Sequence, residues 1–176
     1  NASALGLTGI LQTPMKRFDL THQVNIRGTF LCSQVCFPYL AEAANPHILN
    51  IAPPLNLDAK WFAPHLAYTL SKYGMSLCTL GMAEAFKENE VAVNSLWPRT
   101  AIATAAVASL GGEVALQRCR RPEIMADAAY LILTKPSRAC TGNFFLDEEL
   151  LRSNGITDFD RYAVSPGTPL IPDLFV

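Results

Sequence analysis

The sequence predicts an α/β fold: a doubly wound parallel sheet with helices on both faces, in three α/β/α layers. Short, nearly continuous apolar stretches alternate along the chain with longer stretches of helical periodicity. This alternation is typical of parallel strands buried beneath helices. The chain has 176 residues, of which 50% are hydrophobic, enough for one sizeable core but not for two.

The first expected helix spans about residues 16–40. Apolar residues recur in it at helical spacing: Val24, Leu31 and Val35. Gly28 lies in the same stripe and is expected to be a position of close packing. Pro38 is expected to interrupt or kink the last turn, because proline has no backbone N–H to donate. A turn then leads to a buried strand at residues 47–51.

A loop rich in proline and asparagine precedes the second long helix, at about residues 66–87. One face of this helix carries Tyr68, Lys72, Met75 and Thr79. A strand is expected at residues 91–96, a helix from Pro122 to about residue 133, and a last strand at residues 143–146. Three prolines between residues 153 and 176 disfavour regular structure, so we expect a docked tail or a linker there.

Composition argues against several classes of partner. Lys and Arg number 14 against 15 Asp and Glu, so no excess charge attracts nucleic acid or an anionic membrane surface. No apolar run approaches the roughly 20 residues that a membrane-spanning helix needs. The five cysteines lack a Cys-x-x-Cys spacing and most lie in apolar stretches. They are expected to be buried free thiols of an intracellular protein, and no metal site is expected.

Tyr68 and Lys72 are the first candidates for chemistry. Four residues apart on a helix, their side chains share a face and can reach one ligand. A neighbouring ammonium favours the phenolate and lowers the pKa of a tyrosine, so the two could form a proton-transfer pair. The same spacing also occurs by chance on many surface helices, and taken alone it favours that interpretation.

The surroundings of this pair match, in order, the short-chain dehydrogenase/reductase superfamily. The Tyr-x-x-x-Lys motif follows a strand that ends at Asn50 and an upstream helix with Asn25 and Gly28. Further segments resemble the family's other motifs: Asn1-Ala2-Ser3, Val93-Asn94 through Pro98, and Thr141-Gly142. The resemblance covers nearly the whole chain. Residues 53–57, 96–102 and 126–130 resemble one particular subfamily more closely.

The resemblance implies a Rossmann-type fold. Residues 1–152 would be the C-terminal two-thirds of the domain, and its first strands and glycine-rich, pyrophosphate-binding turn would lie upstream of Asn1. It also implies NADP or NAD as cofactor and a small-molecule carbonyl or alcohol as substrate. A homodimer or homotetramer is implied, packed through residues 16–40 and 66–87. The compartment would be the cytoplasm in a bacterium, or a peroxisome or mitochondrion in a eukaryote.

Roles for individual residues follow from the same resemblance. Tyr68 would be the general acid/base, and Lys72 would bind the nicotinamide ribose and lower the tyrosine pKa. Asn25 would hold a water linking Lys72 to solvent, although a helical asparagine can equally face solvent or bond to backbone. Asn1, Pro98 and Thr100 would border the cofactor. Thr104 is an alternative to Thr100, and either threonine could instead cap a helix.

Two positions depart from the family pattern. Pro53 stands where the family has a serine that hydrogen-bonds the substrate oxygen, and no Ser or Thr occurs between Asn50 and Tyr68. A replacement donor from this loop could be only Asn56, His65 or a water. Arg99 replaces the family's glycine; it could bind an anionic substrate group or simply face solvent.

The leading hypothesis is therefore an NAD(P)-dependent oxidoreductase that transfers hydride between nicotinamide and a carbonyl or alcohol. Apolar Trp61, Phe62 and Leu66 would flank the substrate, which suits a lipid-like or steroid-like compound, though they could equally belong to the core. The alternative is a non-catalytic module of the same fold that senses nucleotides or forms oligomers. Pro53 and Arg99 favour this alternative.

Overall fold

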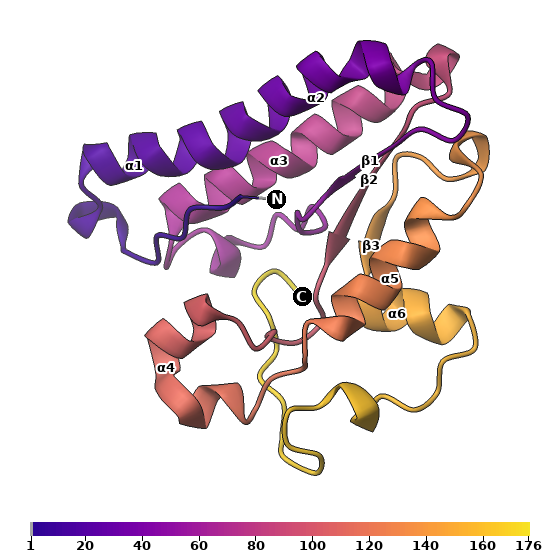
Figure 1. Ribbon diagram of the computed structural model, residues 1–176. Coiled ribbons are helices and arrows are strands. Elements are labelled where there is room, and N and C mark those ends of the chain that lie inside the picture. Colours follow the sequence, from indigo (N-terminus) through magenta and orange to yellow (C-terminus); the bar gives the residue numbers. More distant parts are fainter. Residues whose placement is uncertain (1) are drawn as a thin grey trace. The chain divides into compact units, whose positions relative to one another are not determined.

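The strands of the computed structural model, which describes residues 2–176, form one sheet in the order β1-β2-β3 (Figure 1). β1 (His47–Asn50) pairs in parallel with β2 (Ala92–Trp97), and β3 (Phe144–Leu146) lies on the other side of β2. Every residue of β2 is buried, including the polar Asn94 and Ser95, as in a strand that is covered on both faces. The three expected strands are confirmed to within one residue at each end. A parallel sheet flanked by helices confirms the predicted Rossmann-type class.

The chain divides into two compact units. The first comprises residues up to Ser95, Lys135–Phe144 and Phe175. The second comprises Leu96–Thr134, Phe145–Leu174 and Val176.

In the first unit, the expected helix at residues 16–40 has three parts: α1 (Met15–His22), the π-helical segment η2 (Gln23–Arg27) and α2 (Gly28–Leu40). In η2 the N–H of Gly28 reaches the carbonyl of Gln23, five residues back. Such π-helical turns occur frequently at functional sites. Pro38 lies inside α2, which continues for two more residues instead of ending.

The second long helix of this unit is α3 (Leu66–Ala85), as predicted. It packs tightly against η2 at Gly74, where an added Cβ would lie 2.4 Å from Ile26 Cδ1. At Gly28 an added Cβ would meet its nearest neighbour at 3.7 Å, which is ordinary contact. The prediction that Gly28 is the close-packing glycine was therefore wrong. Helical periodicity identifies a stripe but does not tell which partner residue will face it.

The second unit contains α4 (Ala105–Leu116), α5 (Glu123–Leu133) and α6 (Asp147–Ser153). Only α5 was predicted. α4 begins at Thr104, whose Oγ1 accepts a hydrogen bond from the Val107 N–H at 3.5 Å, and it bends at Gly112, where φ is +63°. The first turn of α6 carries three acidic residues, which the helix dipole favours.

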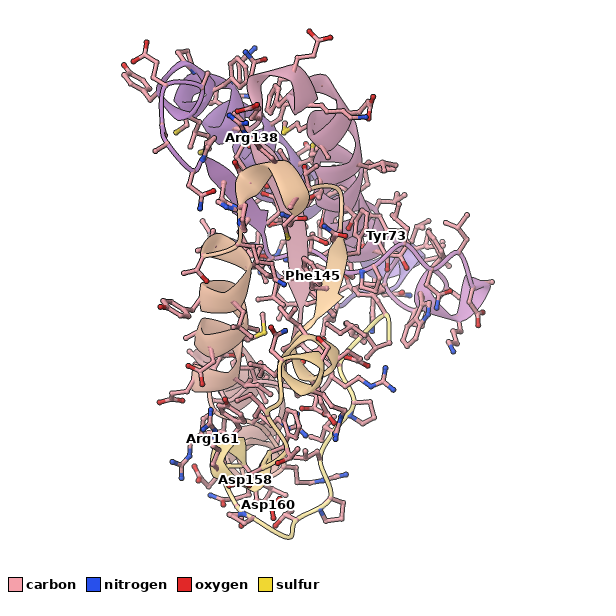
Figure 2. The ribbon with its side chains drawn as sticks, turned by 90° about the vertical axis from the view of Figure 1, so that its right-hand side faces the viewer. Tyr73, Arg138, Phe145, Asp158, Asp160 and Arg161 are labelled. Carbon is pink, nitrogen blue, oxygen red and sulfur yellow. The ribbon has the colours of Figure 1, made fainter. Side chains whose placement is uncertain are left out.

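Short 3-10 helices complete the structure: Ile10–Gln12, Ala59–Trp61, Lys87–Asn89, Ser137–Ala139 and Asp160–Tyr162. The last of these lies in the proline-containing segment after α6. There Arg161, which Figure 2 labels, forms an ion pair with Asp127 of α5 at 3.1 Å. The same segment forms isolated bridges to Thr100 and Arg120 within the second unit.

The prediction of buried thiols holds for Cys119 and Cys140. Cys78 is partly buried, and Cys32 and Cys36 are exposed. These two line a groove of about 450 Å³ that extends along α2 and β1. These cysteines therefore face a groove although their neighbours in sequence are apolar. Apolar neighbours in sequence do not ensure that another element of the fold packs over a side chain. Among residues 2–176, no group of three or more His, Cys, Asp or Glu gathers as metal ligands, and no helix could cross a membrane.

Candidate active site

Tyr68 and Lys72 lie one turn apart on α3, and both are buried, with 6% and 4% of their surfaces exposed. Lys72 Nζ donates a hydrogen bond to the carbonyl of Ile51, directly after β1, at 3.0 Å. Lys72 thus faces the carboxyl end of a sheet strand, the edge at which ligands bind in open α/β sheets. The predicted sharing of a helix face is confirmed.

Two further contacts hold the end of β1 against α3. Ser76 Oγ donates to the carbonyl of Pro53 at 2.7 Å, and Asn50 Nδ2 donates to Thr79 Oγ1 at 2.8 Å. With Lys72, the α3 residues of these contacts follow at helical spacing along one face. Together they fix the loop that leaves β1. Ser76 was missed as a site residue, although its four-residue spacing from Lys72 was a usable signal.

Asn25 is fully buried in η2, so it does not face solvent. Its carboxamide pairs with the backbone of Ala4, accepting from the N–H at 2.8 Å and donating to the carbonyl at 3.0 Å. It also donates to Ser71 Oγ at 2.9 Å, and Ser71 Oγ donates to the carbonyl of Tyr68 at 2.7 Å. Asn25 therefore bonds to backbone, one of its predicted alternatives, and is connected to the Tyr68 backbone through Ser71.

The loop between β1 and α3 bears the departure at Pro53, which is buried. Of the candidate replacement donors, Asn56 is exposed and its Oδ1 accepts the Asp58 N–H at 3.0 Å. His65, directly before α3, has a buried Nδ1 without a hydrogen-bond partner among the described residues. Trp61 Nε1 is likewise buried without a hydrogen-bond partner among the described residues, and the sequence had not suggested it as a donor.

Aromatic side chains surround the first turns of α3. The ring of Phe62 meets Tyr73 edge-on, with centroids 5.3 Å apart. The Tyr73 hydroxyl donates to the carbonyl of Asn56 at 2.5 Å. Burial raises the pKa of Tyr73, although this hydrogen bond acts in the opposite direction. Tyr73 therefore has a structural partner and stays protonated at neutral pH.

The loop after β2 belongs to the second unit. Pro98 is buried, and the Arg99 N–H donates to Asp147 Oδ1 at 2.8 Å. Thr100 Oγ1 is buried and has no hydrogen-bond partner among residues 2–176, whereas Thr104 caps α4. Of the two candidate threonines, Thr100 is therefore the one whose hydroxyl makes no hydrogen bond among the described residues. Asn1, the remaining candidate cofactor residue, lies outside the described residues.

Charged groups hold this loop within the second unit. Arg99 pairs with Glu149 at 3.2 Å, and both side chains are about half exposed, at 49% and 52%. Asp147 is fully buried, and burial raises the pKa of its carboxyl to about 6, although hydrogen bonds from Arg99 and Glu148 N–H groups oppose the shift. Arg120 contacts Glu148 at 2.7 Å. An anionic substrate group would therefore compete with Glu149 for Arg99.

Comparison with known proteins identifies the family. Residues 1–146 match the family model described as Enoyl-(Acyl carrier protein) reductase. The chain belongs to the short-chain dehydrogenase/reductase family. It is 57% identical to Hydroxysteroid dehydrogenase-like protein 2 of Danio rerio and 56% identical to that of Homo sapiens, each over all 176 residues. The subfamily resemblance of residues 53–57, 96–102 and 126–130 is to this protein, and is confirmed.

Solved structures of short-chain dehydrogenases agree with this assignment. A protein from Xanthomonas campestris assigned as a dehydrogenase is 55% identical, with a TM-score of 0.94 over 100% of this chain and 64% of that one. A short-chain dehydrogenase from Mycobacterium thermoresistibile is 48% identical, with a TM-score of 0.93 over 100% and 62%. The chain spans only 42% of the length of the two curated relatives above.

Proposed function

We propose that this chain carries the catalytic centre of an NAD(P)-dependent oxidoreductase that transfers hydride between nicotinamide and a carbonyl or alcohol carbon. The observation that carries the proposal is the placement of Tyr68 and Lys72. Both are buried on one face of α3, at the carboxyl end of β1. Membership of the short-chain dehydrogenase/reductase family supports the same reaction class.

In this mechanism the Tyr68 hydroxyl gives a proton to the carbonyl oxygen during reduction and takes it back during alcohol oxidation. Lys72, one turn away, favours the phenolate electrostatically and binds ribose hydroxyls. Asn25 would hold the water that reconnects Lys72 to solvent. Its carboxamide nitrogen already donates two hydrogen bonds, so the water would donate to an oxygen of Asn25.

The residues of the first unit fit a nicotinamide cofactor, because Lys72 supplies donors for ribose oxygens. In the second unit, taken by itself, the buried Thr100 hydroxyl has no hydrogen-bond partner among the described residues, so a carboxamide would satisfy it. Pro98 and Thr100 stay predicted cofactor residues. Bound NAD or NADP would supply or accept the hydride. Structures sharing this fold at 22% and 20% identity were solved with NADH and with NADP. They support a nicotinamide cofactor without choosing between the two.

The donor that Pro53 cannot supply is assigned to His65. Its Nδ1 is buried and has no partner in the part of the chain that the structure describes. It is the N-cap residue of α3 and precedes Tyr68 by three positions, so it lies at the end of the helix that carries Tyr68. A neutral imidazole protonated at Nδ1 can donate to a substrate oxygen. Trp61 Nε1 is also buried without a partner among the described residues, so its substitution serves as the comparison for His65.

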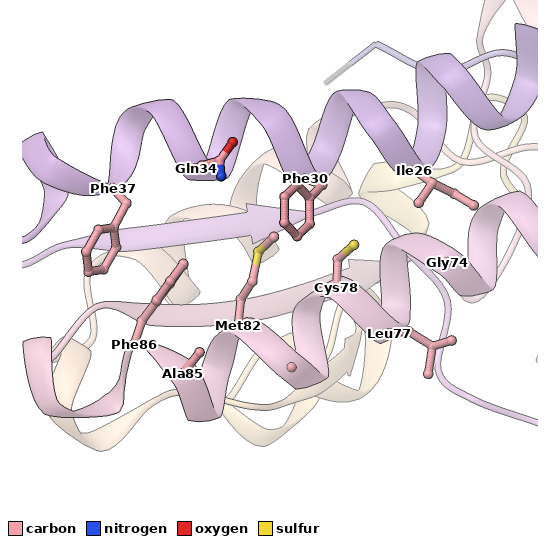
Figure 3. A pocket seen from close by; sticks show the side chains of 11 residues that line it. Ile26, Phe30, Gln34, Phe37, Gly74, Leu77, Cys78, Met82, Ala85 and Phe86 are labelled. Carbon is pink, nitrogen blue, oxygen red and sulfur yellow. The ribbon is translucent and has the colours of Figure 1, made fainter.

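An apolar groove on the first unit supports the expected oligomer. It lies between η2–α2 and α3 and has a volume of about 690 Å³. Figure 3 shows Phe30, Phe37, Met82 and Phe86 directed into the space between the helices. Phe30 and Leu77 are 51% and 56% exposed. Exposed apolar surface of this kind marks interaction sites, and we propose a second copy of the chain as its occupant.

The alternative function, a non-catalytic module of the same fold, is favoured by Pro53 at the donor position. A nucleotide-sensing module would bind the cofactor as the enzyme does, so turnover is the property that separates the two functions. The discriminating experiment follows nicotinamide absorbance in the full-length protein with NAD and NADP against a panel of carbonyls and alcohols, together with Tyr68→Phe and the control Tyr39→Phe. Tyr39 is 78% exposed on α2.

Oxidoreductase activity predicts that Tyr68→Phe lowers turnover by about 10²-fold or more, while Tyr39→Phe leaves it unchanged. Cofactor binding without turnover in the unmodified protein would contradict the enzyme and support the module.

A further inference from the structure

Phe175 belongs to the first unit, although the residues on both sides of it belong to the second. Its ring stacks on that of Tyr68, with an interplanar angle of 29° and centroids 6.4 Å apart. It is 2% exposed, and Tyr68 is 6% exposed. A residue far along the sequence thus lies over the face of the proposed catalytic ring.

Two other aromatic rings hold Phe175 in this position. Its centroid lies 5.3 Å from that of Tyr73, which Figure 2 labels, and 5.8 Å from that of Trp61. Tyr73 is itself fixed through its hydroxyl to the carbonyl of Asn56. Because three rings contact Phe175, it resembles a fixed wall more than a freely swinging side chain.

The backbone at Phe175 is also unusual. Its φ is +73°, in the left-handed region, which non-glycine residues seldom adopt and bulky ones adopt at an energetic cost. Such conformations persist only where surrounding contacts over-determine them, and they cluster at ligand sites. The three ring contacts supply that constraint.

We propose that Phe175 is the specificity-determining wall of the substrate site, and that it limits the width of the group attached to the reacting carbon. This inference rests on the proposed function of Tyr68. Because Phe175 covers one face of the Tyr68 ring, a substrate reaches the hydroxyl past the edge of Phe175 and not across that face. A linear alkyl group can pass beside the rings, whereas a saturated ring on the reacting carbon meets Phe175. Narrow apolar carbinols and ketones are therefore preferred over ring-substituted ones.

The test compares two secondary methyl carbinols in the full-length protein, one with a linear butyl chain and one with a cyclohexyl ring. Phe175→Ala is expected to raise kcat/KM for the cyclohexyl compound relative to the butyl compound by about tenfold or more. Phe175→Leu, which keeps apolar bulk, is expected to shift the ratio less. Phe18→Ala, which removes a ring stacked on His22 in the first unit, should leave it unchanged.

A uniform change in kcat/KM for both compounds in Phe175→Ala would overturn the inference, because loss of packing or opening of a lid affects every substrate alike. Calorimetric dissociation constants for the same two carbinols give a second readout that needs no turnover. If the unmodified protein binds but oxidises neither, the proposed function fails, and the ratio of dissociation constants still decides whether Phe175 is the wall.

Discussion

Asn25 donates a hydrogen bond to Ser71 across 2.9 Å, and both side chains are fully buried. Ser71 Oγ in turn donates a hydrogen bond to the carbonyl of Tyr68. The π-helical segment is thus hydrogen-bonded to the helix that carries the candidate acid/base. The contact joins residues 46 positions apart in sequence. It gives a buried asparagine in the middle of a long helix a side-chain hydrogen-bond partner.

Ser71→Ala is expected to lower the free energy of unfolding by roughly 1–3 kcal/mol, because it leaves a buried Asn25 donor without its serine acceptor. Urea denaturation would measure the change. Ser109→Ala, at an exposed serine of α4 that bonds only within its own helix, is the control and should have little effect. Equal effects of the two substitutions would contradict the proposed connection.

Gly74→Ala is expected to destabilise the first unit by roughly 1–3 kcal/mol, because the new Cβ would overlap Ile26. Gly28→Ala, at a helical glycine with ordinary spacing, should be neutral or slightly stabilising, since alanine favours helix. Thermal unfolding of the two variants makes the comparison. Greater damage from Gly28→Ala would show that the close approach lies in η2–α2 rather than α3.

His65→Phe tests the assignment of the substitute donor. Loss of one hydrogen bond to the developing oxyanion is expected to lower kcat by about 10²-fold with little change in cofactor binding. Trp61→Phe also removes a buried N–H without a partner among the described residues, and should have a much smaller effect on kcat. A larger loss of kcat in Trp61→Phe than in His65→Phe would assign the donor role to Trp61. Unchanged kcat in both variants would assign it to a water.

Leu77→Glu places a charge in the apolar groove between α2 and α3. Because a buried unpaired carboxylate is costly, the variant is expected to shift the protein from oligomer towards monomer, as judged by sedimentation velocity. Leu110→Glu, at a leucine of α4 that is 60% exposed, is the matched control and should leave the distribution unchanged. A monomeric unmodified protein would refute this use of the groove.

Asp147→Asn is expected to change how stability depends on pH. The carboxyl pKa is about 6 in the folded protein against an ordinary value of 3.8, so folding favours the protonated form. Stability contributed by this group is therefore full at low pH and is lost as pH rises from about 4 to about 6, by roughly 3 kcal/mol. An asparagine can accept the same two backbone hydrogen bonds without titrating.

Urea denaturation across this pH range measures the difference in unfolding free energy between Asp147→Asn and the unmodified protein. That difference should move in favour of the variant as pH rises. Asp158→Asn, at an exposed carboxylate, should run parallel to the unmodified protein. A parallel curve for Asp147→Asn would show that the buried carboxyl does not titrate in this range.

The sequence by itself determined the features that depend on local periodicity. The strands β1, β2 and β3, the helices α3 and α5, and the relation of Tyr68 to Lys72 follow from spacing within a few residues. The absence of a hydroxyl at Pro53 could also be predicted from the sequence. Helices α4 and α6 were missed, since α4 is interrupted at Gly112 and α6 has only seven residues.

Only the tertiary structure decided which distant residues meet. It placed the close approach at Gly74 instead of Gly28, joined Asn25 to Ser71, and exposed Cys32 and Cys36 along a groove. It also laid Phe175 on Tyr68. The reason is physical: periodicity fixes the face on which a side chain lies, whereas its partner depends on how separate elements pack, which no local pattern records.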